Sequence, residues 1–473
     1  MTLIPGQSVA ITLQELAHEA AQQATQQNNA VLVSVTERVY GSYDAVELFD
    51  HSRAVTADRF FWSQPDRAFT LVGLGIAHAL DAVEESRFRQ IGTSWRQILS
   101  KAILEDPCGL PGTGPLLLGG FAFDTQRAKS QLWHGYPDGR MVLPRVLFTM
   151  INGETWLTCN ILVQPDSNPD DEAADLSALV EELLNSTPSY STEPKVAKLQ
   201  VFSRELRPAE AWKHEVVLTA ADIRQGKLEK AVLARPVLLE ASDDFDLAST
   251  LRNLSNAYSD CNVFAIARDE RCFLGATPER LAEVRDGEVR TMSLAGTIRR
   301  GATPAEDEAL GTALLESAKD RREHAVVVQT LVETLGKLCS DLQVDASPSL
   351  LKLGNVQHLY TLIKGHLPGD YTLLDVIELL HPTPAMGGRP RDKALALIRE
   401  REGFDRGWYA APVGWMDRNG EGEFAVAIRS ALVYHNQATL FAGCGIVADS
   451  DPEREYAESC LKLKPMLSAL TGE

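Results

Sequence analysis

Three short turns constrain the fold of this chain more than any other feature of its sequence. Each lies between two β-rich runs: Asn152-Gly153 between 141–150 and 154–163, Asp286-Gly287 between 280–285 and 288–292, and Asn419-Gly420 between 414–417 and 423–432. Asn-Gly and Asp-Gly pairs favour the left-handed backbone of a tight two-residue hairpin. Each turn therefore predicts a pair of neighbouring antiparallel strands, and antiparallel sheet is expected in both halves of the chain.

Segments of helical period lie between these groups of strands, at 12–27, 86–104, 208–225, 319–340, 372–380 and 392–402, and after Pro452. Helices between runs of antiparallel strands indicate the α+β class. Residues 185–198 are rich in Ser, Thr and Pro, a composition typical of a surface connection. They mark the predicted boundary between an N-terminal part, 1–198, with mixed strands and helices that pack on the core, and a second part, 199–473.

The charge of the chain restricts its partners. It has 473 residues and a formal net charge of −19, with no block of Lys and Arg, so we expect neither nucleic acid nor a membrane surface as a partner. No run approaches membrane-spanning length, and no basic segment followed by an apolar one opens the chain. Its seven cysteines are scattered without a C-x-x-C pair, which predicts a reduced compartment, the cytoplasm. An anionic substrate would need locally placed cations or a metal.

A glycine turn near the C-terminus precedes a charged helical stripe. The turn is FAGCGIV at 441–447, and the stripe consists of Glu455, Glu458 and Lys462. Asp451 is placed to cap a helix and Pro452 to occupy its first turn, so the three charged residues fall on one face of that helix. Such a stripe can hold a divalent cation beside an anion, with the glycines leaving backbone N–H groups accessible. A solvated helix face is the alternative.

Other polar residues of the second part stand at predicted strand ends or on an otherwise apolar helix face. They are Lys230, Glu279, Glu323 and Arg429. Each has a structural interpretation beside a functional one: Lys230 and Arg429 can reach solvent along an apolar surface, Glu279 can pair with the next residue, and Glu323 can pair with Lys319 one helical turn earlier.

Seven motifs combine these residues in a familiar order. They are KAVLAR (230–235), GATPER (275–280), LAGTIR (294–299), DRREH (320–324), HLYT (358–361), HPTPAM (381–386) and the segment 443–462. In this order they resemble the chorismate-utilising enzymes, and among them the isochorismate synthases, over about residues 201–470. Residues 1–200 match more loosely, through FFW at 60–62 and VGLG at 72–75. The resemblance implies largely antiparallel sheets packed face to face, with helices on the outside.

The resemblance also implies a reaction. Isochorismate synthases deliver water to C2 of chorismate while the C4 hydroxyl leaves and the ring double bonds shift. By resemblance, Lys230 is the base that takes a proton from water, and Glu279 is the acid that protonates the leaving hydroxyl. Both residues would then be in unusual protonation states near neutral pH, with Lys230 neutral and Glu279 protonated, which requires burial or neighbouring charge.

The family binds the ring carboxylate of its substrate through Mg²⁺. By position, Glu323 and Glu458 are the implied ligands, with Glu455 acting directly or through water. The residues implied to contact the substrate are Arg429, Lys462, Gly443, Gly445, Gly296, Thr297, His381, Ala385 and Met386. His381 has a structural role as an equal alternative, and His358 is interpreted as structural.

Two positions separate the relatives. Anthranilate synthases carry Gln in place of Lys230, and aminodeoxychorismate synthases carry Lys in place of Ala295, so water is the expected nucleophile and no glutaminase subunit is expected. Salicylate synthase, which shares Lys230 and Glu279 and then eliminates pyruvate, is the alternative reaction, and a catalytically silent chorismate-binding paralogue is the alternative class. A monomer or weak homo-oligomer is expected. The product would feed quinone (menaquinone), siderophore or salicylate synthesis, and the sequence does not separate these uses.

Overall fold

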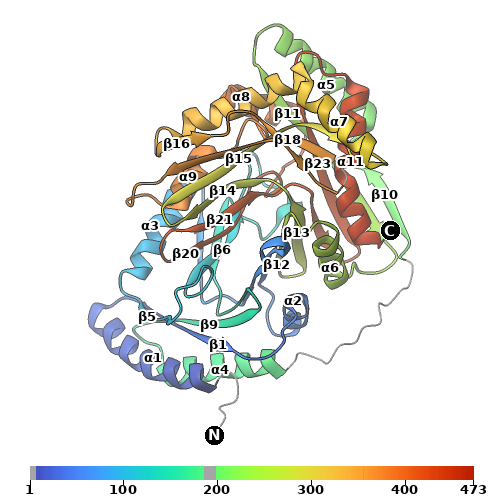
Figure 1. Cartoon of the computed structure of the whole chain (residues 1–473). Coiled ribbons are helices and arrows are strands. Elements are labelled where there is room, and N and C mark those ends of the chain that lie inside the picture. Colours follow the sequence, from blue (N-terminus) through green and yellow to red (C-terminus); the bar gives the residue numbers. More distant parts are fainter. Residues whose placement is uncertain (1–6, 186–198, 355, 473) are drawn as a thin grey trace.

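Two large sheets form the centre of this computed structural model, which describes residues 7–185, 199–354 and 356–472 (Figure 1). The first sheet has 13 strands in the described part of the chain. In order across the sheet they are β10 (Val201–Glu205), β11 (Lys230–Ala241), β23 (Gln437–Ile446), β22 (Ser430–Tyr434), β13 (Arg271–Thr277), β12 (Asn262–Arg268), β2 (Arg59–Gln64), β3 (Phe69–Leu74), β8 (Val146–Ile151), β9 (Glu154–Val163), β1 (Val31–Val39) and β5 (Ile103–Glu105), with β19 (Gly388–Arg389) also beside β11.

The second sheet has 10 strands within the same described residues. In order they are β16 (Ser340–Val344), β18 (Val356–His366), β15 (Glu288–Arg299), β14 (Arg280–Arg285), β21 (Gly422–Val426), β20 (Pro412–Asp417), β6 (Leu116–Phe121), β7 (Gly139–Leu143) and β4 (His78–Ala82), with β17 (Ser349–Lys352) also beside β18. The pairing of β1 with β5 is parallel. The other pairings found among the described strands are antiparallel, as predicted.

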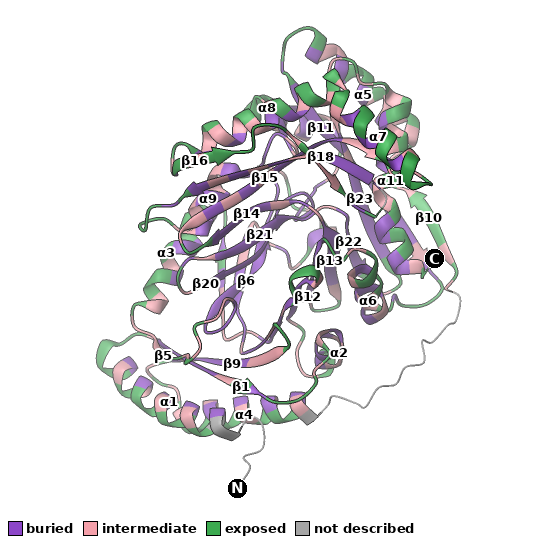
Figure 2. Ribbon diagram, in the orientation of Figure 1, coloured by how far each residue is buried: buried purple, intermediate pink, exposed green. Residues whose placement is uncertain are grey.

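Helices cover the outer faces of both sheets, where they turn exposed residues to solvent while the strands are largely buried (Figures 1 and 2). The described helices are α1 (Gln7–Gln27), α2 (Ala45–His51), α3 (Arg87–Leu99), α4 (Pro169–Asn185), α5 (Ala209–Arg224), α6 (Leu247–Ala257), α7 (Pro304–Glu316), α8 (Ala318–Leu335), α9 (Leu373–Leu380), α10 (Arg391–Arg401) and α11 (Pro452–Thr471). No helix in these ranges is both long and apolar enough to cross a membrane.

The buried core falls into layers that follow this arrangement. One apolar cluster joins the inner faces of the two sheets and includes Phe60, Trp62 and Phe264 from the first sheet and Leu118, Val413 and Ala425 from the second. A second cluster packs α1, α4, α6 and α11 on the outer face of the first sheet. A third packs α3, α8 and α9 on the outer face of the second. Face-to-face sheets with outer helices confirm the predicted α+β architecture.

The predicted hairpin turns are present. Asn152 and Gly153 have φ values of 52° and 80°, and Asp286 and Gly287 have 51° and 73°, the left-handed values that the sequence pattern requires. Gly420, with φ 77°, turns β20 into β21. These turns were predictable because the preference for positive φ is a property of the residues themselves.

Two strand predictions are wrong in one respect, because each predicted strand is divided between the two sheets. Residues 141–150 form β7 in the second sheet and β8 in the first, separated at Pro144, which has no N–H to donate to a strand ladder. Residues 423–432 form β21 in the second sheet and β22 in the first, separated at 427–429. Pro144-Arg145 is a local signal for the first break and Arg429 stands at the second, but neither indicates that the following residues join the other sheet.

Two predicted helices extend too far. The helix expected over 86–104 ends at Leu99, and residues 103–105 form β5. The helix expected over 319–340 ends at Leu335, beside Gly336, and residue 340 begins β16. Buried residues such as Cys339 continue the apolar pattern past the helix end, which explains the error.

In each sheet the strands from before residue 198 form one continuous block and those from after it form another, and the two blocks meet at one strand pair. β2 of the N-terminal part pairs with β12, and β6 pairs with β20. The predicted boundary segment lies largely at 186–198, outside the described residues. The two parts of the chain thus share both sheets.

Candidate active site

A cavity of about 400 Å³ lies where the two sheets meet. All but one of the predicted site residues line it: Lys230, Glu279, Gly296, Thr297, Glu323, Ala385, Met386, Arg429, Gly443, Gly445, Glu455, Glu458 and Lys462. They come from segments more than 200 residues apart in the chain. The structure therefore brings together the residues that the motifs singled out.

Glu279 stands where the chain crosses from β13 in the first sheet to β14 in the second. Its side chain is buried, and burial raises the pKa of the carboxyl to about 7, against the opposing charges of Lys230, Arg429 and Lys462. Removing a carboxylate from water disfavours its charged form, and this outweighs the three cations. Glu279 therefore keeps its proton up to neutral pH.

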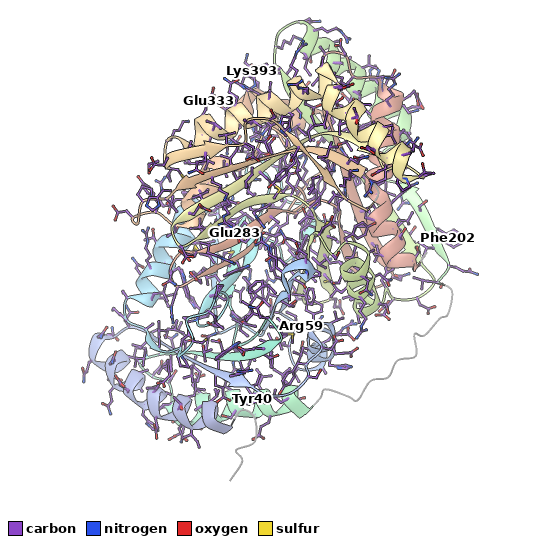
Figure 3. All side chains as sticks on the ribbon, in the orientation of Figure 1. Tyr40, Arg59, Phe202, Glu283, Glu333 and Lys393 are labelled. Carbon is purple, nitrogen blue, oxygen red and sulfur yellow. The ribbon has the colours of Figure 1, made fainter. Side chains whose placement is uncertain are left out.

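The next residue, Arg280, holds the backbone in place where the chain passes from β13 to β14. Its guanidinium contacts two buried carboxylates, donating from Nε to Glu423 (2.9 Å) and lying 3.2 Å from Glu283. Glu423 also accepts a hydrogen bond from Gln64 on β2 (2.7 Å), so the group joins the two sheets. Figure 3 marks Glu283 within the body of the molecule. Because its charges are paired and hydrogen-bonded, this buried network holds the backbone beside Glu279 in one position.

Lys230 begins β11 and forms an ion pair with Glu323 of α8, with Nζ 2.7 Å from Oε1. The Lys230 side chain is 6% exposed and that of Glu323 is 18% exposed. Although the sequence suggested that Glu323 could pair with Lys319, its partner is a residue from the opposite sheet. The ion pair links β11 to α8 in the wall of the cavity.

Gly445 provides the space that Lys230 occupies. A Cβ atom at position 445 would lie 2.6 Å from Cε and 3.0 Å from Nζ of Lys230. Contacts this short force the lysine side chain to move. From the sequence, we interpreted this glycine as giving an anion access to backbone N–H groups. The structure adds a second reason: only a residue without Cβ leaves space for the Lys230 side chain.

If Lys230 is the predicted base, Gly445→Ala is expected to lower kcat/KM about 100-fold, since displacing a reacting group by about 1 Å has an effect of that order. Steady-state kinetics on the predicted substrate would measure it. Gly369→Ala is the matched control, because a Cβ atom there meets nothing within 4 Å. Unchanged kinetics in Gly445→Ala would show that the position of Lys230 is unimportant.

The backbone N–H groups of Gly443 and Gly445 point away from β11. Gly445 lies opposite Val232 and Gly443 opposite Ala234. The Val232 N–H donates to Gly387 O (2.9 Å) and the Ala234 N–H to a Glu402 carboxylate oxygen (2.7 Å), not to β23. In an antiparallel pair, two opposite residues either bond to each other or both direct their N–H and C=O groups away from the partner strand. Val232 and Ala234 direct theirs away from β23, so Gly443 and Gly445 direct theirs away from β11. Both glycines line the cavity, so their N–H groups are placed to meet an anion.

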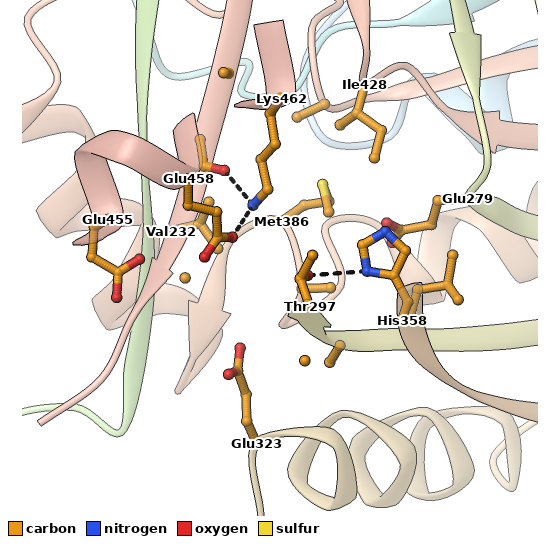
Figure 4. A pocket seen from close by; sticks show the side chains of 18 of the residues that line it. Val232, Glu279, Thr297, Glu323, His358, Met386, Ile428, Glu455, Glu458 and Lys462 are labelled. Atoms are coloured by element: carbon orange, nitrogen blue, oxygen red, sulfur yellow. Dashed lines mark hydrogen bonds and ion pairs between the residues drawn. The ribbon is translucent and has the colours of Figure 1, made fainter. Parts of the chain in front are cut away.

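Three carboxylates face one part of the cavity. Figure 4 shows Glu323 reaching in from α8, while Glu455 and Glu458 reach in from α11. Burial and the charge of Glu458 raise the pKa of Glu455, which shows that the two carboxylates on α11 repel each other. A group of carboxylate oxygens suits a hard divalent cation such as Mg²⁺, whose charge would relieve this repulsion. The donor chemistry therefore fits the predicted metal, but Glu323 pairs with Lys230 here and is not among the ligand atoms that lie within 4.8 Å of one another in the described residues.

Cys444 lies within 4.8 Å of ligand atoms of Glu455 and Glu458, but it does not suit a cation. Its thiol is buried and its Sγ donates to the Glu455 backbone carbonyl (3.2 Å). Burial raises the pKa of the thiol well above its ordinary value. A thiol ligates metals as the thiolate, so the carboxylates remain the candidate donors.

Two cations line the cavity beside these carboxylates. Lys462 lies 2.6 Å from Glu458 and donates to Gly443 O (2.9 Å). Burial opposes its charge, yet nearby Cys444 and Glu458 raise its pKa above the ordinary value. Arg429, at the break between β21 and β22, has φ 50°, a left-handed conformation that costs a non-glycine residue roughly 1–2 kcal/mol. The fold thus places a buried guanidinium in the cavity through a strained backbone.

The structure also adds residues to the site. His358, predicted to be structural, lines the cavity, with Nδ1 3.0 Å from Thr297 Oγ1. Burial, with the charges of Arg429 and Lys462, lowers its pKa to about 3, so it is a neutral hydrogen-bonding group. Tyr409 also lines the cavity, and burial raises its pKa to about 12. Tyr409 was missed because it belongs to none of the seven motifs and to no regular element.

His381 is the predicted substrate-binding residue that does not line the cavity. Its ring lies against Phe88 and Phe123, and Nε2 is 3.1 Å from Phe123 O. Burial lowers its pKa well below the ordinary value. This placement corresponds to the structural alternative for His381 and gives it no direct path to a ligand in the cavity.

The amino-acid sequence of the chain is similar to those of known proteins. The family described as "Chorismate binding enzyme" matches residues 19–471. The chain is 36% identical to the isochorismate synthase MenF of Bacillus subtilis, over 97% of each chain. It is 38% identical to the salicylate biosynthesis isochorismate synthase of Pseudomonas aeruginosa, over 87% of this chain and 84% of that one.

Solved structures agree with these relatives. The menaquinone-specific isochorismate synthase MenF from Escherichia coli is similar with a TM-score of 0.79 and 26% identity, over 98% of this chain and all of that one (100%). Anthranilate synthase component I from Streptococcus pneumoniae has a TM-score of 0.67 and 21% identity, over 86% of this chain and 92% of that one. The second likeness is one of fold alone.

Proposed function

Because this chain belongs to the chorismate-binding enzyme family, we propose that it is an isochorismate synthase, like the two relatives described above. The single observation that carries the proposal is a buried carboxyl with a pKa near 7, Glu279, in the same cavity as Lys230. Addition of water at one ring carbon and loss of hydroxyl at another needs one base and one acid. The two residues supply both.

In the proposed reaction, Lys230 takes a proton from the water that bonds to C2 of chorismate. The ring double bonds shift, the C4–O bond breaks, and Glu279 gives its proton to the departing oxygen, which leaves as water. The number of atoms in the ring compound is unchanged, so the product is an isomer of the substrate. A carboxyl whose pKa lies near the working pH is well suited to such proton transfer.

Mg²⁺ is proposed as the cofactor, held by Glu323, Glu458 and Glu455, directly or through water. When bound, it would supply positive charge for a substrate carboxylate. Arg429, Lys462 and the N–H groups of Gly443 and Gly445 are proposed to receive carboxylate oxygens, since an arginine can bind them through two hydrogen bonds. Gly296, Thr297, Ala385 and Met386 complete the walls around the ring.

Removal of divalent ions by EDTA is expected to abolish turnover, and added Mg²⁺ to restore it. Glu458→Gln should raise the Mg²⁺ concentration for half-maximal activity by about 10-fold or more, since even residues that only support a metal ligand change affinity 10- to 100-fold. Glu453→Gln, on the same helix but pointing to Lys213, should behave as the parent. Full activity after exhaustive chelation would contradict the metal assignment.

The pH dependence tests the acid. Because burial raises the pKa of Glu279 from 4.5 to about 7, the carboxyl keeps its proton below pH 7 and loses it above. We therefore expect kcat/KM to fall as pH rises through about 7, since this ratio reports ionisations of the free enzyme. A constant kcat/KM between pH 6 and 9 would contradict the role of Glu279 as acid.

Incubation with chorismate and Mg²⁺, followed by chromatography, tests the function as a whole. Isochorismate should appear as chorismate disappears. Pyruvate and salicylate released at a rate matching chorismate loss would instead assign the protein as a salicylate synthase. No change in chorismate, with Mg²⁺-dependent binding retained in calorimetry, would assign a silent chorismate-binding protein.

A further inference from the structure

A second cavity, of about 680 Å³, adjoins the site. Its walls come from the end of α5, the first turns of α8, the start of α10 and the chain after β23. It shares four lining residues with the catalytic cavity: Lys230, Lys319, Glu323 and Asp449. The Lys230–Glu323 ion pair is therefore part of both walls, and a ligand in the second cavity would lie beside the proposed base.

Part of this wall is apolar. Ile223 and Leu228 are buried, and Val326 and Val447 are half-buried. A cavity of this size falls in the range that holds small organic ligands, and apolar walls favour a ring or another flat hydrocarbon group. Water alone would satisfy such a surface poorly.

The rest of the wall carries an excess of positive charge. It holds five cations, Lys227, Lys230, Lys319, Arg322 and Lys393, and three carboxylates, Glu229, Glu323 and Asp449. Figure 3 marks Lys393 at the outside of the molecule, where it is exposed. In a chain with a net charge of −19, this local excess selects anions against the overall field.

Of these cations, Lys319 and Arg322 are available for a ligand, whereas Lys227 and Lys393 already have partners. Lys227 pairs with Asp222 at 2.6 Å, and Lys393 donates to the Lys227 carbonyl at 3.1 Å. Lys319 and Arg322 lie on exposed turns of α8 and make no hydrogen bond or ion pair with any other side chain in the described part of the chain. They are placed above the apolar wall formed in part by Val326, one helical turn beyond Arg322.

We propose that this second cavity binds a ring-bearing carboxylate, and that its occupant lowers turnover at the adjoining site. The ring packs on Leu228 and Val326, and the carboxylate meets Arg322 and Lys319. Lys230, Lys319 and Glu323 line both cavities, so an occupant that draws Lys319 toward its carboxylate and packs beside the Lys230–Glu323 pair displaces side chains of the catalytic wall. The inhibitory effect rests on the proposed function, because it requires these side chains to act in turnover.

The test uses 1-naphthoate as the probe with the full-length protein, after isochorismate formation has been measured without it. Saturable binding, followed by naphthoate fluorescence, and a fall in kcat with little change in KM for chorismate are expected. Absence of saturable binding, or a purely competitive pattern, would overturn the inference. Absence of isochorismate formation would count against the proposed function instead, and binding would still be measurable.

Variants locate the binding. Arg322→Gln, which removes a cation, and Val326→Phe, which fills the apolar wall, should each weaken naphthoate binding about 10-fold, equivalent to about 1.4 kcal/mol. Their uninhibited kcat and KM should stay within about twofold of the parent. Arg321→Gln is the matched control, since Arg321 is exposed on the same helix and lines neither cavity. Equal binding in all three variants would place the naphthoate elsewhere.

The dependence of the rate on chorismate concentration shows whether the substrate itself is the carboxylate that occupies the second cavity. If chorismate itself occupies the cavity, the rate should fall at high chorismate concentration, and Arg322→Gln should remove this fall. If the rate saturates normally while naphthoate still inhibits, the cavity serves a carboxylate other than the substrate. Both results support the site and differ only in its natural occupant.

Discussion

Glu279→Gln is expected to reduce kcat by about 10²- to 10⁴-fold, the usual contribution of a general acid. Glutamine has nearly the shape of glutamic acid but no proton to give. The buried position of Glu279, with a pKa near 7, means that the neutral amide replaces a group that is itself partly neutral. Steady-state formation of isochorismate measures the loss, and calorimetry measures chorismate binding, which should change little.

Stability separates this catalytic effect from damage to the fold. The pKa of Glu279 is higher in the folded protein than the ordinary 4.5, so the native state loses stability as pH rises from about 4.5 through 7, where burying the carboxylate becomes costly. At pH 8, Glu279→Gln should therefore melt at or above the Tm of the parent. Glu288→Gln, at a half-buried position on a neighbouring strand that does not line the cavity, is the control and should keep full activity. An active Glu279→Gln variant would eliminate Glu279 as the acid.

Lys230→Ala is expected to have a loss of similar size, about 10²- to 10⁴-fold in kcat, because alanine has no amine to take the proton. The backbone of position 230 pairs with Arg389 and continues into the ladder with β23, so β11 should stay in place. The circular dichroism spectrum and the elution volume of the variant should match those of the parent.

A second substitution tests whether the lysine acts chemically or only balances charge. Lys230→Arg keeps a positive charge beside Glu323 but cannot act as a base, since a guanidinium does not lose its proton in proteins. Both variants should therefore be inactive, whereas a charge-balancing role would leave Lys230→Arg active. Lys337→Ala, an exposed lysine beyond the end of α8, serves as the control and should retain parental kinetics.

The local features of the fold could be predicted, and the partition between the sheets could not. Asn152-Gly153 and Asp286-Gly287 encode their own backbone conformation, and Asp451 caps α11 as expected, accepting from Arg454 N at 2.9 Å. The change of sheet at Pro144 and at 427–429 depends on which distant strand is adjacent, information that no short window contains. β18 was missed for a related reason: His358 and Thr361 were considered as a motif and not as part of a strand.

The site was predicted as a set of residues, but the contacts between them were not. The motif resemblance identified most of the residues that line the cavity, among them Lys230 and Lys462. It gave no indication that Glu323 pairs with Lys230 or that Gly445 leaves space for that lysine. His381 lies outside the cavity wall, in keeping with the structural alternative given for it, and Tyr409 was absent from the prediction, because a motif records which residues occur together and not which of them line a cavity.

The position of β23 has a consequence for the newly made chain. This last strand lies between β11 and β22, so the 12 residues of β11 lack their main neighbour until residues 437–446 have left the ribosome. Unpaired strand edges are prone to self-association, and sheets closed by distant segments form slowly. A chain that stops short of β23 therefore loses more than Glu458 and Lys462: it also loses the strand beside which Lys230 is held.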